Sequence, residues 1–410
     1  MPFEVDVAVV GGGPSGSAVA FELASRGHSV LVAEKKHFPR EKTCGDGLTP
    51  RAVKELEAMG LGEELSSWER VKGLRVHAGN RSVEVEWPQL DTFGTLALVK
   101  PRKDLDRIVL SRAEEAGAKV VHGMQAKEPV FEGGVVKGLA ATVDGQKEEI
   151  RAKYVVCAEG AATKFTRSLG RTRDAGYPMG LAIRQYFRSP MQHSGWFEAF
   201  LSIKAGKDAL PGYGWVFPVG DGTVNCGVGL LNTFGGWRDV NLHDLQDSFV
   251  AQLPESWGID VTTASRPRGG RLFMGGSVWP PVGPGFLMVG DAAGMINPCN
   301  GEGIAYGYET GRMAGRHLHE ALTSSRPDPV LDGYRRELET VYGPYYRLGR
   351  RFVGLIGHPI LMEKLVSLSM MSKSVMRFAM TLLANLEAAR AETMEQRGFK
   401  LLKKLAEVKP

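Results

Sequence analysis

A short glycine-rich turn near the N-terminus constrains the fold of this 410-residue chain more than any other feature. The turn reads Gly11-Gly12-Gly13-Pro14-Ser15-Gly16 and matches G-x-G-x-x-G, with a β-branched run at residues 5–10 before it and a helical pattern at 14–25 after it. A second apolar run, at 29–34, ends in the acid Glu34. Such glycines let the backbone approach a pyrophosphate at a helix N-terminus, and the acid accepts from a ribose hydroxyl. The order predicts a βαβ unit that binds a dinucleotide.

A second strand-to-helix junction of this kind lies late in the chain. We call the turn at residues 11–16 the first junction and this segment the second junction. Gly290-Asp291-Ala292-Ala293 follows a short apolar run at 286–289 and precedes a helical pattern at 303–322. A long dinucleotide needs two such contacts, one for the ADP half and one for the ribityl chain and ring. NAD needs no second contact of this kind, so the pair of junctions predicts FAD.

The segments between the two junctions change character along the chain. Helical and strand patterns at 105–116 and 118–122 precede a predicted hairpin, 134–143 and 146–154, about Asp144-Gly145, and then a strand at 154–158. The middle of the chain predicts antiparallel strands at 180–188, 196–203, 212–218 and 223–230, with Asp221-Gly222 as the last turn. We therefore predict an α/β protein with a Rossmann-like FAD-binding domain, an inserted antiparallel β-sheet substrate domain and a C-terminal helical segment.

The predicted domains are discontinuous in sequence. The FAD-binding domain takes residues 1–75, 97–176 and 275–330. The substrate-binding β domain takes 76–96 and 177–274, and the helical region takes 331–410.

Composition excludes several classes of protein. Hydrophobic residues make up 43% and charged residues 24%, which is typical of a globular chain. The four cysteines, Cys44, Cys157, Cys226 and Cys299, form no C-x-x-C pair, so we expect no metal site and no disulfide scaffold. The acidic start of the chain is unlike a signal peptide, and no stretch approaches the roughly 20 apolar residues that span a bilayer. We expect a soluble or peripheral protein in a reducing compartment.

The end of the chain is basic. Residues 341–410 hold twelve Lys and Arg against five Asp and Glu, whereas the whole chain has a net charge of only +5. This region has no groove-reading motif, so we expect attraction to anionic lipid headgroups and not to nucleic acid, most strongly at 397–409. Helical spacing also predicts an apolar face beside basic residues, which either packs on the FAD-binding domain or covers a lipid entrance at the membrane. That face holds Leu361, Leu365, Leu368, Met371 and Val375, beside Lys364, Lys373 and Arg377.

Together with these motifs, Arg102-x-x-Leu105-Asp106 and Asn300-Gly301-Glu302-Gly303 resemble the p-hydroxybenzoate-hydroxylase-type flavoprotein superfamily. Within it, the segments 42–48 and 210–218 are similar to the geranylgeranyl reductase family, whose most specific mark is Tyr-x-Trp-x-Phe-Pro. The sequence Cys-Gly-Asp-Gly-Leu-Thr-Pro is most similar to the actinobacterial menaquinone reductases of that family. The resemblance covers residues 5–322, with a looser match beyond.

The resemblance implies a set of cofactor contacts. The ADP half of FAD would lie against the first turn and its acid, with Arg102 pairing with the phosphates or the ribityl chain. The flavin would be lined by Cys44, Gly45 and Gly47, which we call the cysteine loop. The second junction would hold the ribityl hydroxyls and the pyrimidine end of the ring. The implied residues are Gly11, Gly13, Pro14, Ser15, Gly16, Glu34, Lys35, Cys44, Gly45, Gly47, Arg102, Ala126, Gly290, Asp291, Gly303 and Ile304.

Three aromatic residues are candidates for the substrate wall. Tyr213, Trp215 and Phe217 alternate along one predicted strand and therefore share a face. The family resemblance implies that they bind an isoprenoid chain, although packing inside the sheet also explains Phe217. Cys44, Tyr213 and Trp215 are the catalytic candidates. The general acid stays open among Cys44, Tyr213 and a water molecule, and the basic stretch before Cys44 predicts a lowered thiol pKa. For Cys299 we expect packing.

The implied reaction is saturation of a C=C bond in the isoprenoid chain of a membrane lipid, by hydride transfer from N5 of reduced FAD plus protonation. Menaquinone is the first candidate substrate, and geranylgeranyl diphosphate or a geranylgeranyl phospholipid is the alternative. An FAD-dependent aromatic monooxygenase or halogenase and a non-catalytic lipid-binding flavoprotein also remain open. The electron donor, NAD(P)H or a ferredoxin-like partner protein, is not predicted. We expect a cytoplasmic protein attached to the inner face of the cell membrane.

Overall fold

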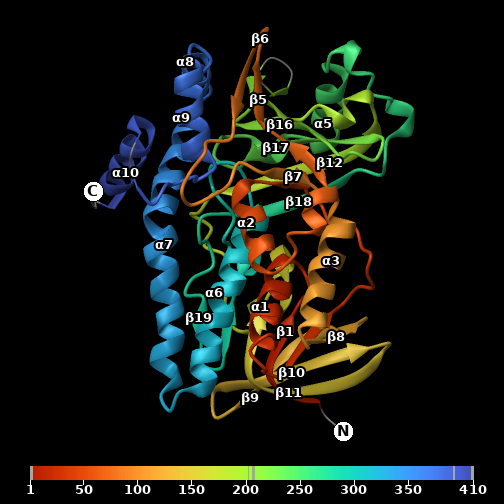
Figure 1. Cartoon of the computed structure of the whole chain (residues 1–410), viewed down its shortest axis with the longest axis vertical. Coiled ribbons are helices and arrows are strands. Elements are labelled where there is room, and N and C mark those ends of the chain that lie inside the picture. The colour runs from red at the N-terminus through yellow and green to blue at the C-terminus, as the bar shows by residue number, and fades with distance from the viewer. Residues whose placement is uncertain (1–2, 202, 206–207, 391–392, 408–410) are drawn as a thin grey trace.

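In the computed structural model, which describes residues 3–201, 203–205, 208–390 and 393–407, two large sheets occupy opposite ends of the molecule (Figure 1). The first sheet has the order β19-β20-β11-β1-β2-β8, and its neighbours from β20 to β8 run parallel. These strands are β1 (Phe3–Val10), β2 (Val30–Glu34), β8 (Lys119–His122), β11 (Gln146–Cys157), β19 (Val282–Gly283) and β20 (Phe286–Met288). Its central strands carry the buried apolar runs: residues 7–10 of β1, 30–33 of β2 and 155–157 of β11 are all buried.

One strand of this sheet corrects the sequence prediction. Residues 146–157 form the single strand β11 where two strands meeting at Tyr154 were expected. Its first half pairs with β10 (Val135–Val143) in an antiparallel meander that also includes β9 (Gln125–Glu132), and its end lies in the parallel sheet. Along β11 the sequence changes from alternating to continuous apolar residues. This change marks the point where the strand leaves the antiparallel meander for the buried parallel sheet, and the strand itself does not break there. The hairpin at Asp144-Gly145 is confirmed, and both residues have positive φ.

The second sheet has the order β18-β12-β17-β16-β13-β5-β6 and is antiparallel except where β13 meets β5. Its strands are β5 (Gly73–Ala78), β6 (Arg81–Glu86), β12 (Met179–Arg188), β13 (Trp196–Phe200), β16 (Gly212–Pro218), β17 (Thr223–Leu231) and β18 (Arg268–Phe273). The strand expected at 196–203 ends at Phe200, and residue 202 lies outside the described residues. β18 was not predicted. The fold class is confirmed: an α/β FAD-binding fold with a second, antiparallel sheet.

Smaller elements connect the two sheets. The strands β3 (Gly47–Leu48), β4 (Glu69–Val71) and β7 (Ala97–Val99) form a third sheet, and β14 (Lys204–Ala205) pairs with β15 (Asp208–Ala209). The shorter helices are α2 (Pro50–Ala58), α4 (Lys164–Ser168) and α5 (Leu242–Ala251).

Two helices that begin at the junctions pack backbone to backbone. Helix α1 (Pro14–Ala24) lies between α3 (Arg102–Glu115) and α6 (Ile304–Thr323). A Cβ atom added to Gly311 of α6 would stand 2.5 Å from the carbonyl oxygen of Ser15, and one added to Gly315 would stand 2.6 Å from Cβ of Glu22. Because side chains at these positions would collide with α1, the glycines fix a close spacing between the two helices.

The C-terminal region is helical, as expected. It consists of α7 (Pro327–Ile356), α8 (Pro359–Ser369), α9 (Lys373–Leu383) and α10 (Met394–Glu407), and α7 runs along the side of the molecule toward the second sheet (Figure 1). Within the described ranges no single helix has the length and apolar character to cross a membrane, whereas α7 and residues 361–369 of α8, bent by 112°, pass that test together on length and composition.

Candidate functional site

Two glycines of the first glycine-rich turn, Gly11 and Gly16, are packed too tightly for any other residue type. Gly11 has φ +102°, and a Cβ there would stand 2.7 Å from the carbonyl oxygen of Ala158 at the end of β11. A Cβ on Gly16 would stand 1.9 Å from the carbonyl oxygen of Gly11. Gly13 is the N-cap of α1 and brings no side chain to the helix start. The turn thus presents the N-terminus of α1, where free N–H groups and the helix dipole favour an anion.

Glu34 lies at the end of β2, beside this turn. Its carboxylate is buried and accepts hydrogen bonds from the N–H groups of Gly12 and Lys36, both at 2.9 Å. These bonds fix the carboxylate in the place expected for a ribose acceptor. Lys35, the next residue, is exposed, and Ala126 lies on β9 opposite Ala141.

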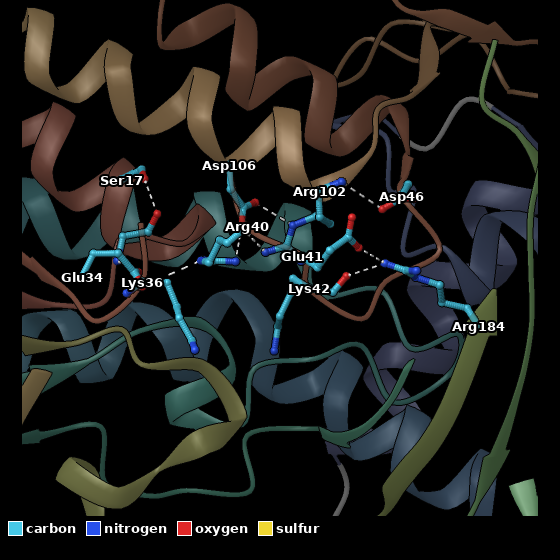
Figure 2. A network of polar contacts seen from close by, with 11 residues as sticks. Ser17, Glu34, Lys36, Arg40, Glu41, Lys42, Asp46, Arg102, Asp106 and Arg184 are labelled. Carbon is cyan, nitrogen blue, oxygen red and sulfur yellow. Dashed lines mark hydrogen bonds and ion pairs between the residues drawn. The ribbon is translucent and has the colours of Figure 1, made fainter. Parts of the chain in front are cut away.

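Cationic side chains gather beside the first junction, where Figure 2 shows Arg40, Lys42 and Arg102 close to one another. Arg102, at the start of α3, makes two hydrogen bonds to the carboxylate of Asp106, at 2.6 and 2.8 Å. Arg40 contacts the same carboxylate at 2.9 Å, and burial lowers the pKa of the nearby Lys42 ammonium. No cofactor contact was predicted for Arg40 or Lys42, although the basic run that precedes Cys44 was a usable signal. This donor set suits a diphosphate.

Asp46 is a buried node that joins the cysteine loop to the second sheet. It has φ +64°, and its carboxylate accepts from the N–H of Arg102 at 3.1 Å, from Nδ2 of Asn225 at 2.7 Å and from the hydroxyl of Tyr186. Burial raises the pKa of Asp46 to about 6. An Asp in the left-handed region is strained relative to Gly, and its three hydrogen bonds offset that strain.

Asn225 of β17 connects three parts of the site. Besides Asp46, its Nδ2 donates to the carbonyl oxygen of Cys44 at 2.9 Å, and its Oδ1 accepts from Nε1 of Trp215 at 3.0 Å. The side chain is fully buried. Asn225 therefore fixes the orientation of the Trp215 indole relative to the cysteine loop. Asp46 lies within the family-like segment 42–48, but no role was predicted for it. No motif marked Asn225, for which the only signal was a polar residue within the apolar run of 223–230.

The aromatic wall faces the cysteine loop. Tyr213, Trp215 and Phe217 follow one another along β16, with ring centroids 6.0 and 6.3 Å apart. A Cβ added to Gly45 would stand 3.1 Å from the ring of Phe217 and 3.3 Å from Nε1 of Trp215. Glycine at position 45 therefore lets the loop backbone lie directly against the wall. The Phe217 ring also packs against Phe197, with centroids 4.3 Å apart, as expected for a core residue.

Two of the catalytic candidates, Cys44 and Tyr213, have raised pKa values and keep their protons. Burial raises the pKa of the Cys44 thiol, and the nearby Arg102 only partly opposes this effect. The predicted lowering of that pKa is therefore wrong, because removal from water outweighs the basic neighbours. Burial also raises the pKa of Tyr213, whose hydroxyl donates to the carbonyl oxygen of Asn300 at 2.7 Å. Cys299 packs against Gly349 of α7.

The two junctions are in direct contact. Gly290 has φ +55°, and a Cβ there would stand 2.0 Å from Oγ of Ser15 in the first turn. Asp291 follows in a short 3₁₀ helix, Gly290–Ala293. A Cβ added to Gly303, the N-cap of α6, would stand 3.2 Å from Oδ1 of Asp291. Asp291 and the N-terminus of α6, which begins with Ile304, therefore lie side by side.

One buried hydroxyl near this site has no partner within the protein. Tyr308 of α6 is fully buried, and no side chain or backbone group in the described ranges hydrogen-bonds its hydroxyl. Asp106, Arg102 and Cys44 all act on its pKa, which places the hydroxyl close to the cation cluster. The two helix N-termini and the cation cluster fit the diphosphate of FAD. The carboxylates of Glu34 and Asp291 fit its hydroxyl groups, and the unpartnered Tyr308 hydroxyl leaves a hydrogen bond for a bound ligand. The fold and the site define an FAD-binding flavoprotein.

Comparisons with known proteins agree with this class. The sequence profile of the FAD binding domain family matches residues 4–343. A menaquinone reductase of Mycolicibacterium smegmatis is 36% identical over 391 residues, which cover 94% of this chain and 93% of the relative. A digeranylgeranylglycerophospholipid reductase of Methanosarcina acetivorans is 29% identical over 367 residues, 88% of this chain and 83% of the relative.

A solved structure shows the same fold. It is the geranylgeranyl bacteriochlorophyll reductase-like protein of Thermoplasma acidophilum, with a TM-score of 0.81 and 23% identity over 98% of this chain and all of that one. The chain belongs to the geranylgeranyl reductase family of FAD-dependent oxidoreductases. It is an FAD-dependent reductase.

Glu302, just before α6, gives a first prediction. Burial raises the pKa of its carboxyl to about 7, and its Oε1 accepts from the hydroxyl of Thr49. Because the pKa is higher in the folded state than in the unfolded state, the free energy of unfolding is highest below the unfolded pKa, where the carboxyl is protonated in both states. It falls as the pH rises through about 7, where the buried carboxyl ionises. Glu302→Gln removes the charge and keeps the acceptor. We expect its stability relative to wild type to rise by about 3 kcal/mol from pH 4 to pH 8.

The measurement is the melting temperature of the two FAD-loaded proteins across that pH range. Glu57→Gln, at an exposed position on α2, serves as the control and should follow the wild-type profile. A difference between Glu302→Gln and wild type that does not change with pH would show that Glu302 is not buried as a titrating acid.

Proposed function

We propose that this flavoprotein saturates a C=C bond in the isoprenoid chain of menaquinone. The observation that carries the proposal is the aromatic wall of β16 lying against the glycines of the cysteine loop. A relative named menaquinone reductase, similar over 94% of this chain, supports the choice of substrate. An isoprenoid offers no polar group, so an apolar aromatic surface is the chemistry that can bind and orient it.

The proposed roles of the wall are binding and orientation. Trp215 is held by Asn225 and cannot rotate freely, so the isoprenoid chain would meet a fixed indole face. As one alkene carbon takes up the proton, positive charge would develop on the carbon that receives the hydride, and the faces of Trp215 and Tyr213 would stabilise it by roughly 0.5–2 kcal/mol. Positioning in the slot must supply more of the rate enhancement than this electrostatic effect.

The cofactor and the proton have separate sites. FAD, once reduced, supplies a hydride from N5, and the residues that would hold it are the two junctions, Arg40, Lys42 and Arg102. The second hydrogen arrives as a proton, for which the Cys44 thiol and the Tyr213 hydroxyl are the candidates, since both keep their protons near neutral pH. Cys44, Gly45 and Gly47 would line the flavin, and Asp291 would accept from the ribityl hydroxyls.

The test is mass spectrometry of lipids incubated with the chemically reduced holoprotein. We expect menaquinone in detergent to gain two hydrogens per turnover in its side chain, with the naphthoquinone ring otherwise unchanged. Two hydrogens on geranylgeranyl diphosphate or on a geranylgeranyl phospholipid alone would keep the reaction and replace the substrate. The native electron donor is then found by comparing NADPH, NADH and reduced ferredoxin in place of the chemical reductant.

Two outcomes would contradict the reaction itself. Oxygen consumption with an aromatic substrate and unchanged prenyl lipids would identify a monooxygenase or halogenase. Tight binding of menaquinone without turnover, with the flavin spectroscopically reduced, would identify a lipid carrier. Peripheral attachment to the inner face of the cell membrane is part of the same proposal, because the substrate resides in the bilayer.

A further inference from the structure

We infer that the connection between α8 and α9 is the surface that inserts into an anionic bilayer. We define the α8–α9 tip as the apolar side chains Leu365, Leu368, Met371 and Val375 together with the basic side chains Lys364, Lys373 and Arg377. This inference rests on the proposed function and names the surface through which the substrate is reached.

The apolar part of the tip faces outward. Leu368 is 54% exposed and Met371 is 71% exposed, and Leu365 and Val375 are exposed as well. The two helices stand at the end of the molecule opposite to β8–β11 (Figure 1). A cluster of large exposed apolar side chains at one end of a protein marks an interaction surface.

The charge of the tip indicates the kind of surface it meets. Lys364, Lys373 and Arg377 are exposed and form no ion pair within the described part of the chain, and Glu363 is the acid beside them. Apolar side chains flanked by unpaired bases complement a layer of anionic headgroups over hydrocarbon. On α10, by contrast, Lys403 pairs with Glu387 at 2.5 Å and Lys400 donates to a backbone carbonyl. The tip therefore fits a bilayer better than the basic stretch expected at 397–409, of which residues 408 and 409 lie outside the described residues.

The inner side of the same helices leads toward the aromatic wall. Met370, Met376 and Met380 are buried in one apolar cluster with Trp87 and Phe197, and Phe217 packs against this cluster. A hollow of about 260 Å³ opens beside α9, and most of its lining is polar, with Trp87 and Leu90 as its large apolar side chains. Apolar side chains thus connect the tip with the wall of β16, and flexible methionines can repack around a passing isoprenoid chain.

The experiment measures sedimentation of the FAD-loaded protein with vesicles, without reductant or turnover. Vesicles of phosphatidylcholine alone are compared with vesicles that also contain phosphatidylglycerol. We expect the wild type to bind the anionic vesicles, and the double variant Leu368→Asp with Met371→Asp to lose about tenfold or more in partitioning. Lys364→Gln with Lys373→Gln should weaken binding to anionic vesicles only.

A matched control comes from α10, where Leu401 and Leu405 are 58% and 56% exposed. Leu401→Asp with Leu405→Asp introduces the same charge at similar exposure and should bind vesicles as the wild type does. All variants should keep their flavin spectrum and their activity on menaquinone in detergent, so a failure of the docking surface is distinct from a failure of the proposed function.

Four results would overturn the inference. The wild type could fail to bind anionic vesicles, or the tip variant could bind them as well as the wild type does. The α10 variant could lose binding instead. A tip variant that changes the oligomeric state in gel filtration would show that the tip is an interface between copies of this chain.

Discussion

Arg51→Met is expected to lower the free energy of unfolding by about 3–5 kcal/mol, because it leaves the largely buried carboxylate of Glu309 without its cationic partner. Arg51 of α2 lies 2.6 Å from Oε1 of Glu309, donates to Oε2 of Glu309 at 2.9 Å and donates to the carbonyl oxygen of Asn385 at 2.8 Å. Its guanidinium also lies over the rings of Tyr306 and Phe93, at 5.0 and 5.4 Å. One side chain thus joins α2, α6 and the end of α9.

Two companion variants make this result specific. Arg51→Met with Glu309→Gln removes both charges and keeps an acceptor for the hydroxyl of Tyr342, so it should lose less stability than Arg51→Met alone. Arg335→Met breaks the more exposed ion pair with Asp332 and should cost much less stability than Arg51→Met. Urea unfolding of the FAD-loaded proteins measures all three. Equal losses for Arg51→Met and Arg335→Met would refute the argument.

Asn225→Asp is expected to make turnover strongly dependent on pH. The new carboxylate would stand beside Asp46, where Nδ2 of Asn225 now lies 2.7 Å from Oδ2 of Asp46, and two carboxylates at that distance cannot both ionise without a large cost. At low pH the pair shares one proton and retains a bond between the two residues. Above the pKa at which that proton leaves, we expect turnover to fall by roughly tenfold per pH unit.

The measurement is the pH profile of turnover on menaquinone in detergent, with the flavin spectrum recorded at each pH. Asn232→Asp is the matched control on the segment that follows β17, because Oδ1 of Asn232 accepts from the N–H of Met179 and a carboxylate keeps that acceptor. Its profile should match the wild type. If Asn225→Asp also follows the wild-type profile, then Asn225 does not position the indole and the loop through Asp46.

Local patterns in the sequence predicted those parts of the molecule whose structure is decided locally. The turn at Gly11–Gly16 needs glycine because of contacts within a few residues and one neighbouring strand, and hairpins such as Asp144-Gly145 depend on backbone dihedral angles alone. Strand β18 and the pairing of β13 with β5 depend on contacts between distant segments, which periodicity does not encode. The continuity of β11 was missed because its two halves have different surroundings.

The site shows the same division. Motifs marked the residues expected to contact a cofactor, and the roles of those residues stay predictions. Asp46, Asn225 and Tyr186 were missed because a buried hydrogen-bond node is defined by geometry between elements 140 or more residues apart. The pKa of Cys44 was misjudged for a related reason: the sequence shows the neighbouring charges, but the removal from water that outweighs them comes from the tertiary fold.

The backbone contact between α1 and α6 has a consequence for the choice of cofactor. Gly290 touches Ser15, and Gly311 sits on the carbonyl of Ser15, so the two helix starts keep one fixed separation. A molecule that interacts with both must have a matching length. A mononucleotide would contact one helix start, whereas an extended dinucleotide would contact both. Discrimination by size is therefore built into glycine contacts between two helices and requires no side chain that recognises the flavin itself.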